Sequence, residues 1–164
     1  MRGHTIVVNT GRGPSGNFRE GIVASGQTFY PGMIVQRDPT VDLVGGAPTY
    51  KIYDRAADGD RPAGALWVVT EILRVEQGYA ITDSIAAGER VMCYSPRPGD
   101  ELNLLYKNVS GTADDVAAGN VMIVDDGTGK LIVTTGTPQS EPAMALEAIV
   151  DPTADTLLWC EWAG

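Results

Sequence analysis

The sequence of 164 residues contains few of the side chains from which metal and catalytic centres are built. It has one histidine, His4, and two cysteines, Cys93 and Cys160, which stand far apart and form no CxxC pair. Zinc sites and disulfide frameworks need closely spaced cysteine or histidine ligands, so neither is predicted. Both cysteines lie in apolar runs, where we interpret them as small buried hydrophobic residues.

Long hydrophobic runs and basic charge are also scarce. No apolar run approaches the roughly 20 residues of a membrane-spanning helix, and the N-terminus lacks the apolar stretch of a signal peptide. We therefore expect no membrane partner and synthesis in the cytoplasm. The 12 Lys and Arg residues stand against 21 Asp and Glu, which gives a net charge of -9. Such a chain repels a phosphate backbone, so no nucleic-acid partner is expected.

The charge is unevenly distributed along the chain. Residues 1–19 contain Arg2, Arg12 and Arg19 but no acidic residue. The Gly- and Pro-containing stretch that follows the first apolar residues favours an extended backbone. We therefore predict an extended, mildly basic N-terminal arm over residues 1–20, with at most one short strand near Thr5 to Val8, and an acidic body over residues 21–164.

The body is rich in residues that favour turns. The 20 Gly and 10 Pro of the chain, with short apolar runs between them, predict many short strands and little helix. We expect a mainly β, single small barrel-like domain of short strands and hairpins. Strands are predicted at Gly21 to Ala24, Gln27 to Tyr30, Met33 to Gln36, Glu101 to Asn108, Lys130 to Thr135, Ala143 to Val150 and Thr156 to Trp162.

Two parts of the body are less regular. Residues 37–65 form a loop-rich insertion, in which one strand is expected from Thr49 to Tyr53. The segment from Trp67 to Val75 is dense in β-branched and aromatic residues and is interpreted as a strand, although Glu71 to Arg74 suits a helical turn equally well.

A short phrase occurs twice in the body. Ala86-Ala87-Gly88 and Ala117-Ala118-Gly119 each follow an apolar residue and each lead, after polar residues, into a Val-Met strand. Two copies predict a repeated hairpin rather than a solenoid, which needs at least three units. Asp125 to Gly129 lies between apolar runs and predicts a further hairpin turn.

No motif of the sequence predicts a catalytic, cofactor-binding or metal-binding residue. Residues 11–16 match GxGxxG, but a dinucleotide site needs a helix directly after that loop, and strand-like sequence follows. His4 lies in the predicted arm, where a catalytic group would be poorly positioned. The acidic pairs at 58 and 60, 114 and 115, and 125 and 126 do not have calcium-loop spacing. We therefore expect a protein that is not an enzyme.

The last predicted strand carries two tryptophans, Trp159 and Trp162. Apolar side chains alternate onto both of its faces, so both faces are expected to be covered. Large aromatic residues of this kind belong to a core or to a subunit contact.

Several of these short sequence motifs follow one another in a characteristic order. A Tyr30-Pro31-Gly32 turn leads into Met33 to Val35, the two Ala-Ala-Gly phrases lead into Val91-Met92 and Val121-Met122, and Met144 to Ala148 follows near the end. This order, over about residues 20–164, resembles the capsid decoration, cement or head-stabilising proteins of tailed bacteriophages. Among them it is similar to the β-tulip-like decoration proteins of lambda-like phages.

The resemblance implies a structural role. Such proteins, made in the host cytoplasm, bind the major capsid protein on the exterior of the expanded head, usually as homotrimers at three-fold sites, and stabilise it in the virion against internal DNA pressure. It also implies that the N-terminal arm binds the capsid by adding a strand to a sheet. In this chain the residues of that arm would be Arg2, Thr5, Ile6, Val7, Val8, Arg12 and Arg19.

The sequence is also compatible with two other classes of protein. A tail-tube, fibre or adhesin β-domain would share the acidic, Gly-rich, all-β composition, but it would assemble into tubes or fibres rather than closed trimers. A β-barrel hydrolase could draw paired carboxylates from distant strands, which leaves no local signature. A deep pocket with converging Asp or Glu side chains would favour the hydrolase.

Overall fold

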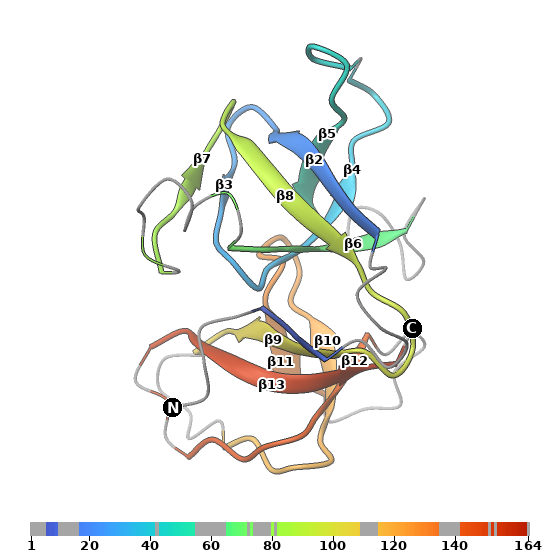
Figure 1. The fold of residues 1–164 in the computed structure, drawn as a ribbon. Helices are drawn as coiled ribbons and strands as arrows, with labels where there is room; N and C mark the ends of the chain where they lie inside the picture. The colour runs from blue at the N-terminus through green and yellow to red at the C-terminus, as the bar shows by residue number, and fades with distance from the viewer. Residues whose placement is uncertain are drawn as a thin grey trace.

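The computed structural model describes residues 6–9, 17–41, 43–54, 65–71, 73, 80, 82–108, 115–134, 142–150, 152 and 154–163. These residues form strands with almost no helix (Figure 1), so the mainly β prediction is confirmed. Within these ranges, no helix is long and apolar enough to cross a membrane. The strands are β1 (Val7–Asn9), β2 (Asn17–Val23), β3 (Thr28–Phe29), β4 (Ile34–Arg37), β5 (Thr49–Ile52), β6 (Leu66–Val69), β7 (Ile85–Ala86), β8 (Arg90–Ser95), β9 (Glu101–Tyr106), β10 (Val121–Val124), β11 (Leu131–Val133), β12 (Ala143–Ala145) and β13 (Thr156–Trp162).

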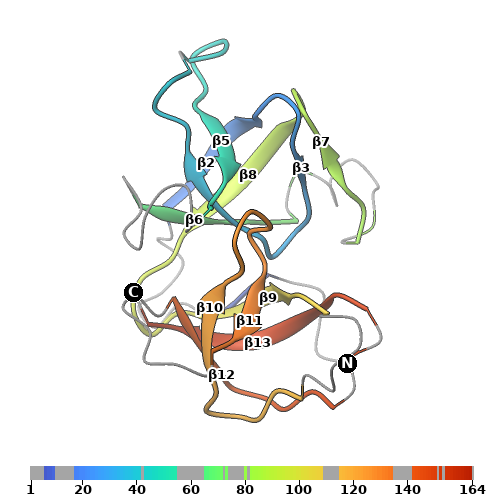
Figure 2. The ribbon, with the colours of Figure 1, turned by 180° about the vertical axis from the view of Figure 1, so that it is seen from behind.

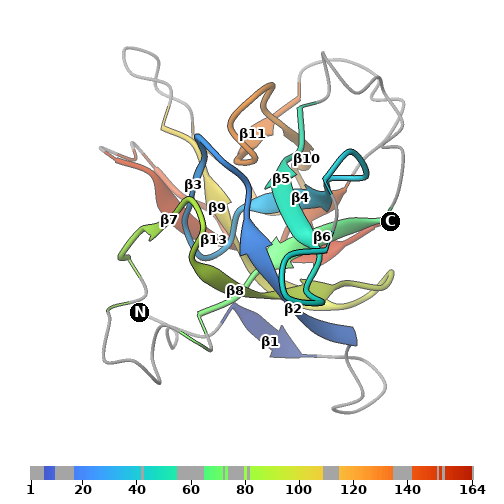
Figure 3. The same ribbon diagram turned by 90° about the horizontal axis from the view of Figure 1, so that it is seen from above.

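Strands β2, β5, β4, β6 and β8 close, in that order, into a small barrel that we call barrel I. Figure 3 looks down on this barrel. The pairing of β2 with β5 is parallel and the other neighbours are antiparallel. The short ribbon β3–β7 lies beside it, and its Phe29 and Ile85 join the buried cluster of barrel I. Each strand of barrel I therefore pairs with two neighbours.

The second sheet forms a ring of its own. Its order is β1-β9-β11-β10-β12-β13, and β9 also pairs with β13. That additional pairing closes β9, β11, β10, β12 and β13 into barrel II, with β1 outside the ring against β9. Figures 1 and 2 show barrel I above barrel II from opposite sides.

The two barrels share their hydrophobic core. The larger buried cluster fills barrel II and also contains Ile34, Val68 and Tyr94 of barrel I. The smaller cluster lies within barrel I, and Leu105 of β9 packs against it. Because burial of apolar surface is continuous across the junction, the two barrels form one packed body.

The predicted Pro31-Gly32 turn is part of the junction between the barrels. Gly32 has φ 87°, its amide donates to Val69 O (2.9 Å) in barrel I, and its carbonyl accepts from the Leu105 amide (2.9 Å) in barrel II. A Cβ atom on Gly32 would lie 2.8 Å from the Leu105 nitrogen. Glycine is therefore required here both by the backbone angle and by the close approach of β9.

The first Ala-Ala-Gly phrase is a tight turn that leads into β8. Gly88 has φ 81°, and the Glu89 amide donates to Ala86 O (3.1 Å) across the turn. The Glu89 carboxylate in return accepts from the Ala86 amide (2.6 Å). Val23, at the end of β2, holds the turn by accepting from the Gly88 amide (3.0 Å) and donating to Glu89 O (3.0 Å).

The second phrase makes the same set of bonds before β10. Gly119 has φ 88°, the Asn120 amide donates to Ala117 O (3.0 Å), and the Asn120 side chain accepts from the Ala117 amide (2.7 Å). Ala145, at the end of β12, makes the bonds that Val23 makes in the first turn. Its carbonyl accepts from the Gly119 amide (2.8 Å), and its amide donates to Asn120 O (2.9 Å). The predicted repeat is therefore present, but each copy is completed by a strand distant in sequence and is not a hairpin.

Most predicted strands are present with different ends. The segments near Gln27, Met33, Thr49, Glu101, Lys130 and Thr156 contain β3, β4, β5, β9, β11 and β13, respectively. The strand predicted from Trp67 already ends at Val69 as β6, and the one predicted over residues 143–150 ends at Ala145 as β12. The turn predicted over residues 125–129 is confirmed, with Asp125 N bonded to Lys130 O (2.8 Å).

The described part of residues 1–20 belongs to the body, which corrects the prediction of a separate extended arm at these positions. Strand β2 begins at Asn17 because its first residues pair with β8, from Asn17–Ser95 onward. Strand β1 pairs with β9, where Val7 lies opposite Leu102. Ile6 has no exposed surface and belongs to the larger core cluster.

Candidate interaction surface

Both the amide and the carbonyl of Ile6 are hydrogen-bonded within the chain. Its amide donates to a carboxylate oxygen of Glu71 (3.2 Å), and its carbonyl accepts from the Asn103 amide (2.7 Å). Ile6 and Val7 are thus engaged within this chain on the side of β9, and β1 is the edge strand of its sheet. That these residues also supply a strand to another protein stays a prediction. The backbone of Val8 lies in the same strand β1. Of the remaining predicted arm residues, Arg2, Thr5 and Arg12 lie outside the described residues.

Arg19 is the predicted contact residue that the structure places at the surface. It is exposed on β2, between exposed Phe18 and Glu20, whose carboxylate pairs with Arg90 (3.0 Å). The Phe18 ring lies against Tyr94, with 4.9 Å between the ring centres. Arg19 therefore projects from a strand whose residues on either side of it in sequence both contact β8.

The two tryptophans of β13 have different surroundings. Trp162 is 4% exposed and lies in the larger core cluster, with its amide bonded to Asp100 O (2.8 Å). Trp159 is half-buried, and its amide donates to the Glu147 carboxylate (2.9 Å). The choice between core and subunit contact that the sequence left open is therefore resolved toward the core for Trp162.

Both cysteines are buried thiols without a disulfide. Burial raises the pKa of Cys93, and burial together with the nearby Glu147 carboxylate raises that of Cys160. A thiol with a raised pKa stays protonated and is a poor nucleophile or metal ligand. The interpretation of both residues as buried hydrophobic side chains is therefore confirmed.

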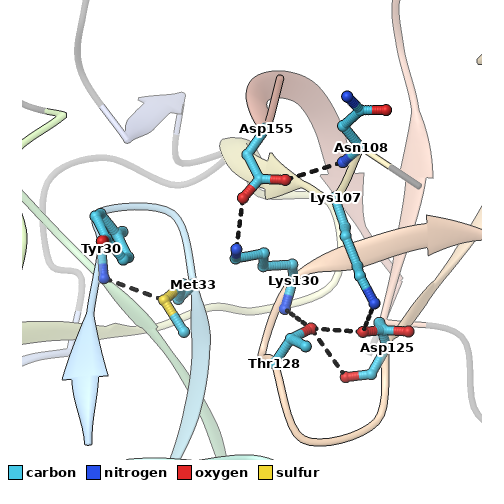
Figure 4. A network of polar contacts seen from close by, with 8 residues as sticks. All are labelled: Tyr30, Met33, Lys107, Asn108, Asp125, Thr128, Lys130 and Asp155. Atoms are coloured by element: carbon cyan, nitrogen blue, oxygen red, sulfur yellow. Dashed lines mark hydrogen bonds and ion pairs between the residues drawn. The ribbon is translucent and has the colours of Figure 1, made fainter. Parts of the chain in front are cut away.

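Asp125 and Asp155 are acidic residues that bond to side chains at the ends of neighbouring strands. Asp125 accepts hydrogen bonds from the Lys107 ammonium (2.7 Å) and the Thr128 hydroxyl (2.8 Å), and Lys130 pairs with Asp155 (Figure 4). These bonds connect the β10–β11 hairpin to the ends of β9 and β13. No three His, Cys, Asp or Glu side chains gather as a metal site among the described residues. His4, the 11–16 motif and the acidic residues at 58, 60 and 114 lie outside them.

The hairpin between β4 and β5 projects beyond barrel I (Figures 1 and 2). Its tip is a two-residue turn at Gly45 and Gly46, with φ 60° and 83°, closed by reciprocal 3.0 Å backbone bonds between Val44 and Ala47. Positive φ at both central residues is typical of a type I′ turn, which glycine adopts without strain. The loop-rich insertion predicted here therefore contains a hairpin tip that is closed by backbone bonds, which the sequence pattern did not indicate.

The base of this hairpin is fixed by polar contacts. The Asp38 carboxylate accepts from the Thr40 hydroxyl (2.7 Å) and amide (2.9 Å), and the Asp38 amide donates to Thr49 O (2.8 Å). The Thr40 side chain, its amide and the charge of Lys51 together lower the pKa of Asp38, against the opposing effect of partial burial. Asp38 is therefore a carboxylate at neutral pH and keeps this turn closed.

Two arginines lie near the hairpin base. Arg37 is exposed at the end of β4, opposite Tyr50 of β5. Burial and the neighbouring Cys93 raise the pKa of Tyr50, while the positive charges of Arg19 and Arg37 both act in the opposite direction. Arg19 of β2 and Arg37 of β4 therefore belong to the two strands that flank β5 in barrel I.

The fold defines an all-β protein of two small barrels with one projecting hairpin. No protein-family model matches the chain, and no curated protein matches it either. Its function therefore has to be inferred from its own residues and from the resemblance that they carry.

Proposed function

We propose that the protein is a capsid decoration protein, which binds the exterior of a tailed-bacteriophage head as a homotrimer at three-fold sites and stabilises the expanded shell. The supporting observation is the agreement between the resemblance and the fold. The resemblance implies a small β-barrel-like protein, and its phrases at Gly32, Gly88 and Gly119 are the positive-φ turns that shape and join the two barrels.

The proposed activity is binding without turnover. A decoration protein that binds the expanded shell and not its dissociated subunits shifts the equilibrium toward the shell. Contacts that are individually weak become effective when three copies act together, because the later contacts form within an already bound complex. The two barrels share a buried cluster, so contacts made by either barrel would act on one packed body.

The test is binding of the purified full chain to empty expanded heads assembled from the cognate major capsid protein. The heads are pelleted and the bound chain is quantified over a concentration series. We expect saturable binding with three copies at each occupied three-fold site, and loaded heads that resist a higher temperature than bare heads. Absence of saturable binding would overturn the proposal.

The mass of the chain in solution distinguishes the proposal from a tail-tube or fibre component. Light scattering after size exclusion is expected to give a trimer, or a monomer that becomes trimeric on the head. A long polymer that forms without heads would contradict the decoration role and favour the tube or fibre class.

A further inference from the structure

The two barrels have the same strand order. In chain order, barrel I consists of β2, β4, β5, β6 and β8, and barrel II of β9, β10, β11, β12 and β13. In each ring the first strand pairs in parallel with the third. The other neighbours are antiparallel in both rings: third with second, second with fourth, fourth with fifth and fifth with first. Each strand of barrel I therefore has a counterpart in barrel II, and β2 corresponds to β9.

Backbone bonds align these two first strands residue by residue. The amide just after the strand, of Lys107 in barrel II and of Ala24 in barrel I, donates to the third strand at 2.9 Å in both barrels. Four residues before these two positions stand Asn103 of β9 and Glu20 of β2, which therefore correspond to each other.

In barrel II this part of the first strand is covered by β1. The Asn103 amide donates to Ile6 O (2.7 Å), and Val7 of β1 lies opposite Leu102. The strand that covers β9 here is thus a short apolar segment from outside the ring.

In barrel I no described residue covers the corresponding part of β2. This strand pairs with β5 only at its last two residues, from Ile22 onward. The Ile22 amide donates to Pro48 O, away from β8, and alternation along the strand turns the amides and carbonyls of Phe18 and Glu20 to the same side. These groups bond to no residue that the structure describes, and Phe18 is 41% exposed. Strand β2 therefore has an open edge where β9 carries β1.

Strand β1 has an unpaired side of its own. Because Ile6 O accepts from β9, alternation turns the amide and carbonyl of the next residue, Val7, away from β9. Strand β1 is the end of its sheet, and no pairing among the described residues joins it to β2. Figure 1 shows β1 in the lower barrel and β2 in the upper one, so the two open edges of one copy lie on different barrels.

We propose that β1 of one copy pairs along the open edge of β2 in a second copy. Unpaired strand edges are sites at which chains join, and β1 is the strand that covers the corresponding edge of β9. The charge also suits a second copy, because exposed Arg19 lies on this stretch of β2 while the chain as a whole carries a net charge of -9. A basic side chain beside the edge attracts the acidic body of another copy.

The two edges are different surfaces, so each copy gives one and receives one. Contacts of this kind close into a ring when the rotation between copies fits. Two short edges form few hydrogen bonds, and the ring adds strength because each copy is held at both edges. Only the number of copies, three, rests on the proposed function.

The experiment places proline on each open edge of the full chain. Glu20→Pro and Val7→Pro each remove an outward amide that bonds to no described residue, and proline is tolerated at such edge positions. Glu20→Ala and Val7→Ala are the matched controls, because they lose the same side-chain contacts, including the ion pair of Glu20 with Arg90, but keep the amide. Melting temperatures verify that all four variants fold.

Light scattering over a concentration series, without heads, measures the association. The unmodified chain is expected to reach the mass of a trimer. Each proline variant should associate more than about tenfold more weakly, and each alanine variant should stay within about twofold of the unmodified chain. A mixture of the two proline variants should form a dimer and nothing larger, because one intact pair of unlike edges remains.

Hydrogen exchange of the unmodified chain tests the same contact without any substitution. The amides of Phe18, Glu20 and Val7 should exchange rapidly in the dilute monomer and at least about tenfold more slowly in the concentrated trimer. Slow exchange in the dilute monomer would mean that the edges are covered within the chain, and the inference would be wrong.

The outcomes separate this inference from the proposed function. A chain that stays monomeric at every concentration, or proline variants that assemble as well as their alanine controls, would overturn the inference. If copies do not associate but the proline variants lose binding to heads, the edges serve another protein, and the inference is wrong while the decoration role stands. If the chain assembles as described but does not bind heads, the inference stands and the proposed function fails.

Discussion

The carbonyl oxygen of Gly129 accepts a hydrogen bond from the amide of Ile34 at 2.7 Å, which joins the β10–β11 hairpin of barrel II to β4 of barrel I. Gly129 has φ 65°, and a Cβ atom on it would lie 2.6 Å from the Ile34 carbonyl oxygen. Together with the reciprocal contact of Gly32 on β9, this bond brings the two barrels to backbone distance. The junction therefore depends on the absence of a side chain at both glycines.

The first prediction tests this close approach with two alanine variants of one hairpin. Gly127 also has positive φ, 71°, but its Cβ position is 3.7 Å from the nearest atom, a carboxylate oxygen of Asp54. Gly127→Ala should lower the free energy of unfolding by about 1–2 kcal/mol, the cost of left-handed backbone. Gly129→Ala should lower it by a further 1–3 kcal/mol or so, because Ile34 must move. Urea denaturation of both variants measures the difference, and equal losses would contradict the predicted role of the junction.

The second prediction concerns the N-terminal segment. Ile6 is fully buried in the shared core, so Ile6→Ala should lower the free energy of unfolding by about 2–5 kcal/mol. Val41→Ala is the control, because that side chain is exposed and its loss should change stability by no more than about 0.5 kcal/mol. Deletion of residues 1–9 should likewise lower the melting temperature. An unchanged melting temperature would show instead that this segment serves only as an arm.

Local features of this fold could be predicted from the sequence, and distant pairings could not. The turns at Pro31-Gly32 and over residues 125–129 follow from the backbone preferences of a few adjacent residues. The burial of Ile6 depends on Glu71 and Asn103, and nothing near Ile6 in the sequence indicates either contact. Ring closure likewise depends on pairs such as Gly21 with Val91.

The candidate interaction surface shows the same limit. Arg19 was found from the sequence because basic residues are concentrated near the N-terminus, whereas exposed Arg37, on β4 of the same barrel, was not singled out. The hairpin tip was missed because residues 37–65 lack periodicity, and an apolar residue in such a segment gives no signal of whether it is buried. That Leu43 is exposed can be recognised only in the folded structure, where the core of barrel I is filled by other residues.

The third prediction tests the repeated turn. In both barrels a side-chain oxygen, from Glu89 or Asn120, accepts the amide of the alanine three residues earlier. Glu89→Ala and Asn120→Ala should each lower the free energy of unfolding by about 0.5–2 kcal/mol, as loss of a comparable helix-capping acceptor does. Glu89→Gln and Asn120→Asp keep an acceptor oxygen and should retain most of it. Chemical denaturation compares the pairs, and equal effects of the alanine and acceptor-retaining variants would argue against a shared role of the side chains.

The fourth prediction follows from the ion pair between Lys130 and Asp155. Burial alone would raise the pKa of Asp155, but hydrogen bonds from Lys130 and the Asn108 amide, with the charges of Lys130 and Lys107, lower it below its ordinary value. A carboxyl group with a lower pKa in the folded state stabilises the fold above its unfolded pKa, about 3.9. This stabilisation disappears as the pH falls through the folded pKa.

Asp155→Asn should therefore have a lower melting temperature than the unmodified chain at pH 7, with a difference that shrinks steadily below about pH 4. Asp126→Asn, at an exposed position in the β10–β11 hairpin, controls for the loss of one negative charge. Melting curves from pH 7 down to the acid limit of folding test the prediction. A difference in melting temperature that stays constant over this range would mean that Asp155 contributes through packing, because a contribution from its negative charge would be lost when the carboxylate is protonated.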